Sequence, residues 1–231
     1  MKKRLVVLTG AGMSAESGIA TFRDSNGLWN NFKVEDVATP EGFRANPELV
    51  LDFYNVRRRE LLKARPNAGH YGLAALEKDF DVRIITQNVD NLHERAGSTS
   101  VLHLHGELMK VRPVNDPDTV YELSADDPDI HVGDTDANGV QLRPFIVWFN
   151  ENVPLINEAA AITHEADILA VVGTSLAVYP AAGLLHHAPA EAPVFLIDPQ
   201  PVSTPYRRVT YIAAPATEGV RLLAHRLNTY L

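Results

Sequence analysis

Hydrophobic residues in this chain gather in short uninterrupted runs, and these runs alternate with longer stretches that carry a helical pattern. Unbroken rather than alternating hydrophobicity is typical of strands that are covered on both faces. The runs are Leu5–Leu8, Val82–Thr86, Ile168–Val172, Val194–Ile197 and Val209–Ile212. The helical stretches are Asn46–Lys63, Ala68–Lys78, Val153–Ala166 and Ala216–Leu227. This order predicts an α/β fold in which crossover helices connect the strands of a parallel sheet.

One segment breaks the alternation. From Arg112 to Gln141 the chain is acidic, rich in turn-forming residues and poor in any helical or strand period. This composition predicts a small loop-rich insertion rather than a second core. Its aspartates do not have the spacing of an EF-hand calcium loop, so a solvated loop is favoured over a calcium site.

Composition and charge exclude some classes of protein but do not indicate a particular function. The 231 residues include 21 Lys and Arg against 29 Asp and Glu, a net charge of −8. This balance lacks the basic surface expected of a nucleic-acid-binding protein. No segment approaches the roughly 20 apolar residues of a membrane helix. The apolar run after Met1–Arg4 ends at Gly10, too early for a signal peptide. We expect a cytoplasmic protein with no nucleic-acid or membrane partner.

A glycine-rich turn follows the first predicted strand. The residues Gly10–Ala15 fit the pattern G-x-G-x-x-G/A, in which small residues permit a tight turn and close approach to a pyrophosphate. A helix N-terminus after such a turn presents N–H groups to the anion. A dehydrogenase also needs an acidic residue at the end of a second strand, and neither Glu35 nor Asp36 lies in one. A dinucleotide therefore remains possible, but a dehydrogenase is disfavoured.

Further motifs follow in order along the chain. They are Thr21-Phe22-Arg23, Gly27-Leu28-Trp29, Thr86–His93, His103–Gly106, Val147–Glu151 and Gly173–Leu176 with Pro180–Ala182. Together with Gly10–Ile19, they resemble the sirtuins, the NAD-consuming protein-lysine deacylases. The resemblance spans Val6 to about Leu227. It implies one catalytic domain over 1–231, a Rossmann-like sheet with a helical part at about 30–65 and an inserted module at about 112–141, and NAD in the cleft between sheet domain and module.

The resemblance also implies which residues hold the NAD. The set is Gly10, Ala11, Gly12, Ser14, Ala15, Thr21, Phe22, Arg23, Gln87, Asn88, Asp90, Gly173, Thr174, Ser175 and Asp198. Asn88 offers a donor and an acceptor to a carboxamide, and Asp90 can accept from ribose hydroxyls. Read without the resemblance, Asp90 is a cap for a short helix over Asn91–Arg95. Phe22 is otherwise a core residue and Arg23 a partner for an anion.

Two residues are assigned to the chemistry, His105 and Asn88. A lone histidine is more often a buried residue with one satisfied nitrogen, although imidazole is the usual general base for a sugar hydroxyl. The resemblance assigns that role to the histidine of the His-Gly pair, which is His105. His103 lies two residues earlier and shares its strand face.

The resemblance implies that Val147, Trp148 and Phe149 bind an extended acyl-lysine peptide by β-augmentation. Asn150 replaces the family's usual glycine, and Asn tolerates the left-handed conformation that this turn needs. Most sirtuins also bind a structural zinc through four cysteines in the inserted module. This chain has no cysteine, and we expect no metal site and no zinc.

Tyr54 and Arg57 are three residues apart, so both can lie on one face of the predicted helix. Taken alone, Arg57-Arg58-Arg59 is a solvated basic face. At this place, however, Tyr-x-x-Arg resembles the sirtuins that remove succinyl and malonyl groups, and Ala38 would widen the acyl pocket. We expect deacylation of acetyl-lysine and of succinyl- or malonyl-lysine, giving nicotinamide and O-acyl-ADP-ribose. The alternatives are mono-ADP-ribosylation and a sensor that binds NAD or ADP-ribose without turnover.

Overall fold

The computed structural model describes residues 2–20, 28–29, 32–202 and 209–231. The chain forms two compact units, each made of separate segments. Unit 1 contains Met1–Thr21, Arg65–Leu104 and Val153–Leu231, and unit 2 contains Phe22–Ala64 and His105–Asn152. Unit 2 therefore combines the predicted helical part with the predicted insertion.

Unit 1 is built on a parallel six-stranded sheet with the strand order β11-β10-β9-β1-β4-β5. The strands are β1 (Arg4–Thr9), β4 (Asp81–Thr86), β5 (Val101–His103), β9 (Ile168–Val172), β10 (Val194–Ile197) and β11 (Val209–Ile212). From β1 the chain first builds outward to β4 and β5, and later returns to add β9 on the other side of β1. The order thus reverses between β1 and β9, which is the topological switch point of the sheet.

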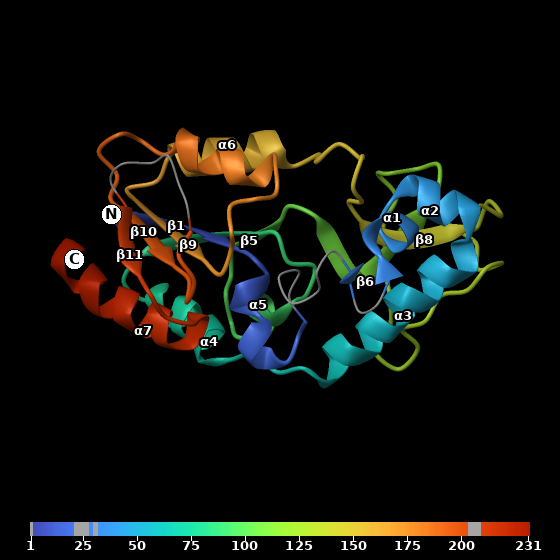
Figure 1. Ribbon diagram of the computed structural model, residues 1–231, viewed down its shortest axis with the longest axis horizontal. Coiled ribbons are helices and arrows are strands. Elements are labelled where there is room, and N and C mark those ends of the chain that lie inside the picture. The colour runs from blue at the N-terminus through green and yellow to red at the C-terminus, as the bar shows by residue number, and fades with distance from the viewer. Residues whose placement is uncertain (1, 21–27, 30–31, 203–208) are drawn as a thin grey trace. The chain divides into compact units, whose positions relative to one another are not determined.

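Helices cover both faces of this sheet, as Figure 1 shows. Leu5 and Val7 pack with α4 (Ala68–Leu76) and α7 (Ala216–Leu227) in one core. Val6 and Leu8 pack in a second core with α6 (Ile156–His164) and the 3₁₀ helix η4 (Ala181–His187). Successive side chains of a strand point to opposite faces, so a strand between two helical layers must be apolar throughout. This explains the unbroken hydrophobic runs of the sequence.

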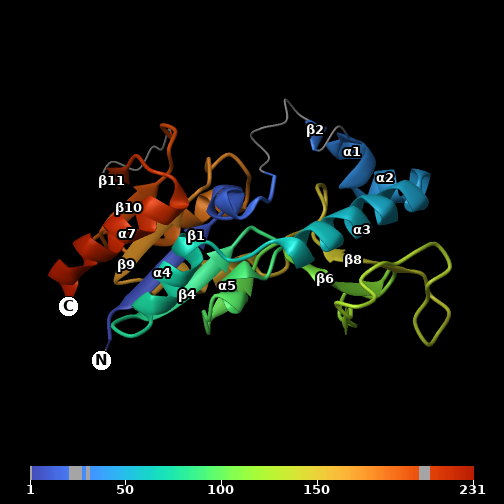
Figure 2. The same cartoon turned by 90° about the horizontal axis from the view of Figure 1, so that it is seen from below.

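Unit 2 combines helices with a small antiparallel sheet. The helices are α1 (Val34–Val37), α2 (Pro40–Ala45) and α3 (Pro47–Lys63), and the sheet order is β7-β6-β8. Its strands are β6 (Gly106–Pro113), β7 (Tyr121–Glu122) and β8 (Leu142–Ile146), and β2 (Leu28–Trp29) pairs with β3 (Phe32–Lys33). Figure 2 shows α3 running along β6 and β8, with which it is in contact.

The acidic insertion is fixed to α3 by the side chain of Asn55. Its amide nitrogen donates to the Ile130 carbonyl at 2.9 Å, and its oxygen accepts from the Ile130 N–H at 3.0 Å. Arg59 forms an ion pair with Asp129 beside this contact. Leu51, Val111 and Ile130 form a small core under it. The middle of the insertion is thus held in place by packing and hydrogen bonds with α3.

The predicted strands and helices agree with the structure. Ile168–Val172, Val194–Ile197, Val209–Ile212 and Ala216–Leu227 have the observed bounds, and the Rossmann-like α/β class is confirmed. The other observed helices, α3, α4 and α6, are shorter than the predicted stretches by one to five terminal residues, which lie in caps and turns. In the described part of the chain, no helix is both long and apolar enough to cross a bilayer.

Candidate functional site

Two glycine-containing turns pack against each other at the switch point of unit 1. One follows β1 and contains Gly10 and Gly12, and the other follows β9 and contains Gly173. A Cβ atom on Gly12 would lie 2.7 Å from the Gly173 Cα. Gly173 has a φ of +62°, and a Cβ there would lie 2.4 Å from the Met13 nitrogen. The turns can therefore meet only if both positions lack a side chain.

The glycine N–H groups take part in this packing. Gly10 donates to the Val172 carbonyl at 3.0 Å, and Gly12 donates to the Gly173 carbonyl at 2.8 Å. The N–H groups of Ala11, Thr174 and Ser175, by contrast, make no hydrogen bond within the described residues. The glycines of the predicted phosphate turn thus allow the two turns to pack closely together. The neighbouring residues Ala11, Thr174 and Ser175 instead offer backbone N–H donors to a ligand. Two short 3₁₀ helices, η1 (Ala11–Met13) and η2 (Ala15–Ser17), follow instead of a long α-helix.

A directional chain of hydrogen bonds links Asn88, Ser14 and Asp90 beside these turns. The Asn88 amide nitrogen donates to the Gly10 carbonyl at 3.1 Å and to the Ser14 hydroxyl at 3.2 Å. Ser14 in turn donates its only proton to Asp90 Oδ2 at 2.9 Å. Both amide protons of Asn88 are thereby used, so its side-chain oxygen is the atom left for a ligand. All three side chains are buried.

Asp90 combines the two roles that the sequence offered. Its Oδ1 accepts from the Leu92 N–H at 3.1 Å at the start of α5 (Leu92–Arg95), as a helix cap does. Burial raises the pKa of this carboxyl, while the bonds from Leu92 and Ser14 and the charge of His103 lower it. A buried carboxylate held by two donors is pre-positioned to accept from hydroxyl groups.

The other described residues of the predicted NAD set follow strands β1, β4, β9 and β10 at the same edge of the sheet. Gln87 donates to the Thr174 hydroxyl at 3.2 Å, which connects the strand ends of β4 and β9. Asp198 follows β10 and is buried, and its Oδ1 accepts from the Gln200 N–H at 2.9 Å. Ala15 begins η2. Thr21, Phe22 and Arg23 lie outside the described residues.

Sequence reasoning missed a pair of buried histidines in the same unit. His70 and His93 are both inaccessible to solvent, and their ring centroids are 4.9 Å apart. His93 Nε2 lies 3.2 Å from the Thr9 hydroxyl, and His70 Nδ1 accepts from the Asn67 N–H. Burial lowers the pKa of His70 to about 4 and that of His93 to about 3. Both rings are therefore neutral at physiological pH. A helix N-cap at Asn67 was the only signal in the sequence.

The second group of candidate residues lies in unit 2. The His105 carbonyl accepts from the Val147 N–H at 2.9 Å, and the Ala38 carbonyl accepts from the Phe149 N–H at 3.0 Å. The structure thus brings the predicted acyl-pocket residue Ala38 beside the predicted peptide-binding segment. Phe149 is 42% exposed. Asn150 has a φ of 69°, the left-handed conformation expected of the residue that replaces glycine.

Tyr54 and Arg57 are buried on the inner face of α3, so the interpretation of the arginine run as a solvated face is wrong for Arg57 and Arg58 and holds only for Arg59. Arg58 is also fully buried, because the helix packs against the small sheet and the insertion. The Arg57 guanidinium lies 3.7 Å from the Phe53 ring centroid, and burial lowers its pKa to about 10, so it stays protonated. The charge of Arg57 also lowers the pKa of Tyr54 against the larger opposing effect of burial, so the two groups are electrostatically coupled.

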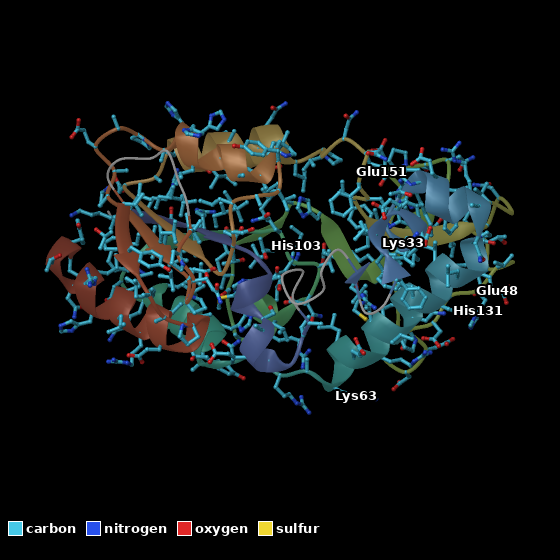
Figure 3. All side chains as sticks on the ribbon, in the orientation of Figure 1. Lys33, Glu48, Lys63, His103, His131 and Glu151 are labelled. Carbon is cyan, nitrogen blue, oxygen red and sulfur yellow. The ribbon has the colours of Figure 1, made fainter. Side chains whose placement is uncertain are left out.

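Trp148 orients the Tyr54 hydroxyl. Its indole nitrogen donates to the Tyr54 oxygen at 3.0 Å, and the ring is buried. Arg143 stacks on the Trp148 ring at 3.4 Å and forms a two-pronged ion pair with Glu151 at 2.7 and 3.0 Å. Glu151, labelled in Figure 3, also accepts from the Trp148 N–H. Within the described residues, the Tyr54 hydroxyl accepts the hydrogen bond from the Trp148 indole and makes none as a donor, so its own proton is available to a ligand.

No group of three or more His, Cys, Asp or Glu side chains that could hold a metal ion occurs in the described part of the chain. The candidate residues supply hydrogen-bond donors and acceptors, the buried guanidinium of Arg57 and the imidazole of His105. These groups suit a polar organic substrate with phosphate and hydroxyl groups.

A Rossmann-like sheet with glycine turns at its switch point defines a nucleotide-binding class of α/β protein. The sequence profile of the Sir2 family matches residues 10–180. The chain belongs to the Sir2 family.

Similar proteins support this assignment over nearly the whole chain. An NAD-dependent protein deacylase of Bacteroides thetaiotaomicron is 56% identical over 229 residues, covering 97% of this chain and 98% of that protein. A Helicobacter pylori protein of the same name is 54% identical over 198 residues, covering 86% and 85%. A solved Sir2 homologue–NAD complex superposes with a TM-score of 0.88 at 37% identity, covering 99% of this chain and 91% of that one.

Proposed function

We propose that this chain is an NAD-dependent protein-lysine deacylase that removes acetyl groups and, with preference, acidic acyl groups such as succinyl and malonyl. Support for the deacylase activity comes from the family and from the Asn88–Ser14–Asp90 chain of hydrogen bonds. In the overall reaction the acyl oxygen displaces nicotinamide from the ribose carbon. Water then releases lysine, and the acyl group leaves as O-acyl-ADP-ribose.

Each candidate residue has a distinct part in this reaction. The Asn88 oxygen accepts from the nicotinamide amide, and Asp90 accepts from a ribose hydroxyl. Ala11, Thr174 and Ser175 donate backbone N–H groups to phosphate oxygens. His105 takes the proton of the ribose hydroxyl that attacks the acyl carbon. Thr21, Phe22 and Arg23 remain in the proposed NAD-binding set, as do Gly10, Gly12, Ala15, Gln87, Gly173 and Asp198. We place the enzyme in the cytoplasm, in keeping with a sequence that has no cysteine.

The acidic-acyl preference is supported by one observation, the burial of a protonated Arg57 beside the donor hydroxyl of Tyr54. Arginine is the side chain best suited to a carboxylate, because its planar fork can donate two parallel hydrogen bonds. Tyr54 adds a neutral O–H donor whose orientation Trp148 fixes. An acetyl group has no carboxylate for either residue. A buried cation that faces an apolar acyl chain would raise the cost of binding it.

The test compares acetyl- and succinyl-lysine in one peptide sequence. Arg57→Met should lower kcat/KM for desuccinylation by about ten- to hundredfold, since hydrogen bonds to charged groups contribute roughly 1.5–3 kcal/mol. Deacetylation should change by less than about threefold. Tyr54→Phe should show the same selectivity with smaller amplitude, because it removes a neutral donor and leaves the guanidinium.

Arg59→Met is the matched control, because Arg59 lies on the same helix but pairs with Asp129 at its surface. It should leave the ratio of the two activities unchanged. An unchanged ratio in Arg57→Met would end the acidic-acyl proposal and leave the deacylase activity standing. Mass spectrometry of the same reactions decides the broader alternatives. A peptide that gains ADP-ribose indicates a mono-ADP-ribosyltransferase, and no nicotinamide release indicates a sensor.

A further inference from the structure

His103 connects the loop that carries Asn88 and Asp90 to a carboxylate on α5. It ends β5, where it pairs in register with Thr86 of β4, and only 7% of its side chain is exposed. Its Nδ1 lies 3.2 Å from the Asn88 carbonyl oxygen, and its Nε2 lies 2.7 Å from Glu94 Oε1. Figure 3 labels His103 near the middle of the view, at the end of β5.

The two partners fix the protons on the ring. A carbonyl oxygen can only accept, so Nδ1 must carry a hydrogen atom. A neutral ring with that tautomer would direct the Nε2 lone pair at the Glu94 carboxylate, and two acceptors at 2.7 Å repel each other. The contact is attractive only with a second proton between Nε2 and Glu94. This geometry therefore favours an imidazolium that donates from both nitrogens, and the 2.7 Å contact with Glu94 has the length of a charge-assisted hydrogen bond.

This arrangement acts on the candidate NAD residues in two ways. The bond to the Asn88 carbonyl holds the backbone of the residue whose side-chain oxygen is left for a ligand. The positive charge also acts on Asp90, and it opposes the effect of Glu94 on the same carboxyl. Among the described residues, His93 on the same helix as Glu94 also interacts electrostatically with His103, and the His70 ring of α4 packs against His93. Both of these rings are neutral at physiological pH, so they add no competing charge there.

We propose that His103, held by Glu94, is a positioning residue for NAD: it sets the backbone of Asn88 and supplies a positive charge beside Asp90. The inference rests on the proposed role of Asn88 and Asp90 in NAD binding. His103 contacts neither substrate in this scheme, and His105 remains the general base. Loss of the shared proton turns the Nε2 contact from attraction into repulsion, which weakens the hold on the loop.

The first measurement is the KM for NAD at neutral pH, with the KM for the acyl-peptide as an internal reference. His103→Leu should raise the KM for NAD by about tenfold or more, because the Asn88 carbonyl loses a charge-assisted donor. The peptide KM should change by less than about twofold. His103→Asn should recover much of the loss, because its amide nitrogen can donate to the same carbonyl from the δ position. His225→Asn on the exposed side of α7 is the control and should match the wild type.

The second measurement is the pH profile, which a merely structural role would not alter. In the wild type the KM for NAD should rise at alkaline pH, as the shared proton is lost. In His103→Asn it should stay flat, since the amide does not titrate. Glu94→Gln should also remove the dependence, because a neutral amide can donate to Nε2 of a neutral ring that keeps its Nδ1 proton.

The outcomes separate this inference from the proposed function. Asn88→Ala and Asp90→Asn are measured in parallel. If they leave the KM for NAD unchanged, the proposed NAD site is wrong. If they raise it while His103→Leu does not, only the role of His103 is refuted. The role of His103 would also be refuted if His103→Leu and His103→Asn raised the KM for NAD equally and the rise of this KM at alkaline pH persisted in both variants. Circular dichroism and thermal unfolding of each variant identify any loss that comes from misfolding.

Discussion

The buried pair His70–His93 should make the protein lose stability on mild acidification, before most carboxylates titrate. Both rings have a folded-state pKa far below the ordinary value of 6.5, at about 4 and about 3. A depressed pKa means that the unfolded chain binds protons more readily than the folded one. Stability is therefore complete above about pH 6.5 and falls as the pH drops toward the folded-state values.

The size of the loss follows from these pKa values. At pH 5 both rings are still neutral in the folded protein, whereas in the unfolded chain they are mostly protonated. A pH of 5 lies about 1.5 units below the ordinary histidine pKa. At about 1.4 kcal/mol per unit, each ring therefore lowers the free energy of unfolding by roughly 2 kcal/mol. The pair together should lower the free energy of unfolding by about 4 kcal/mol between pH 7.5 and pH 5. Asp90 acts in the opposite direction, because burial raises its pKa.

Urea unfolding at a series of pH values from 7.5 to 5 measures this dependence. His93→Gln should remove about half of the slope, because it deletes one titrating ring and retains a polar partner for the Thr9 hydroxyl. His225→Gln is the matched control, since it makes the same substitution at an exposed position on α7. An equal slope in the wild type and in His93→Gln would refute the reasoning and show that the acid sensitivity arises elsewhere.

Three further predictions test the site and the fold. His105→Ala should reduce deacylation by about 10²–10⁴-fold while NAD binding persists, since loss of a general base has this range, and near-normal turnover would contradict the assignment. Protein purified without added metal should contain no stoichiometric zinc and keep full activity in a strong chelator; one tightly bound zinc per chain, as seen by metal analysis, would show that His and Asp ligands had been recruited. Gly12→Ala should lower the free energy of unfolding by about 1–3 kcal/mol, because its Cβ would meet the Gly173 backbone at 2.7 Å. Gly183→Ala is its control in a thermal melt, because a Cβ there meets nothing nearer than 4.0 Å.

The strands of the sheet could be predicted because their pattern reflects a simple physical condition. A strand between two helical layers must be apolar on both faces, so Ile168–Val172 and Val194–Ile197 are visible as unbroken runs. The helix predicted from Asn46 begins one residue later, at Pro47, because Asn46 is its N-cap. The family motifs then place Asn88 and Asp90 beyond a strand end, which is where the structure has them.

The remaining features depend on contacts between distant segments, and local sequence does not encode them. Arg58 is indistinguishable from its neighbours in a basic run, yet α3 buries it and leaves Arg59 at the surface. Trp148 belongs to a motif associated with peptide binding, but its indole reaches Tyr54 across the unit. Nothing near His103 in sequence indicates that Glu94 and the Asn88 carbonyl will face its two nitrogens. Such partners are defined only when the strands are in register.

The central position of β1 has a consequence for synthesis of the chain on the ribosome. β1 emerges first, and β4 can pair with one of its edges once residue 86 is made. The other edge waits for β9, which ends at residue 172, after the whole of unit 2 has been translated. A nascent chain thus carries an apolar strand with one open edge while the 86 residues between the ends of β4 and β9 are added, about 4–17 seconds at ribosomal rates of about 5–20 residues per second. Open apolar edges recruit other strands. Aggregation during expression should therefore peak for chains halted before β9 and fall sharply once that strand has emerged.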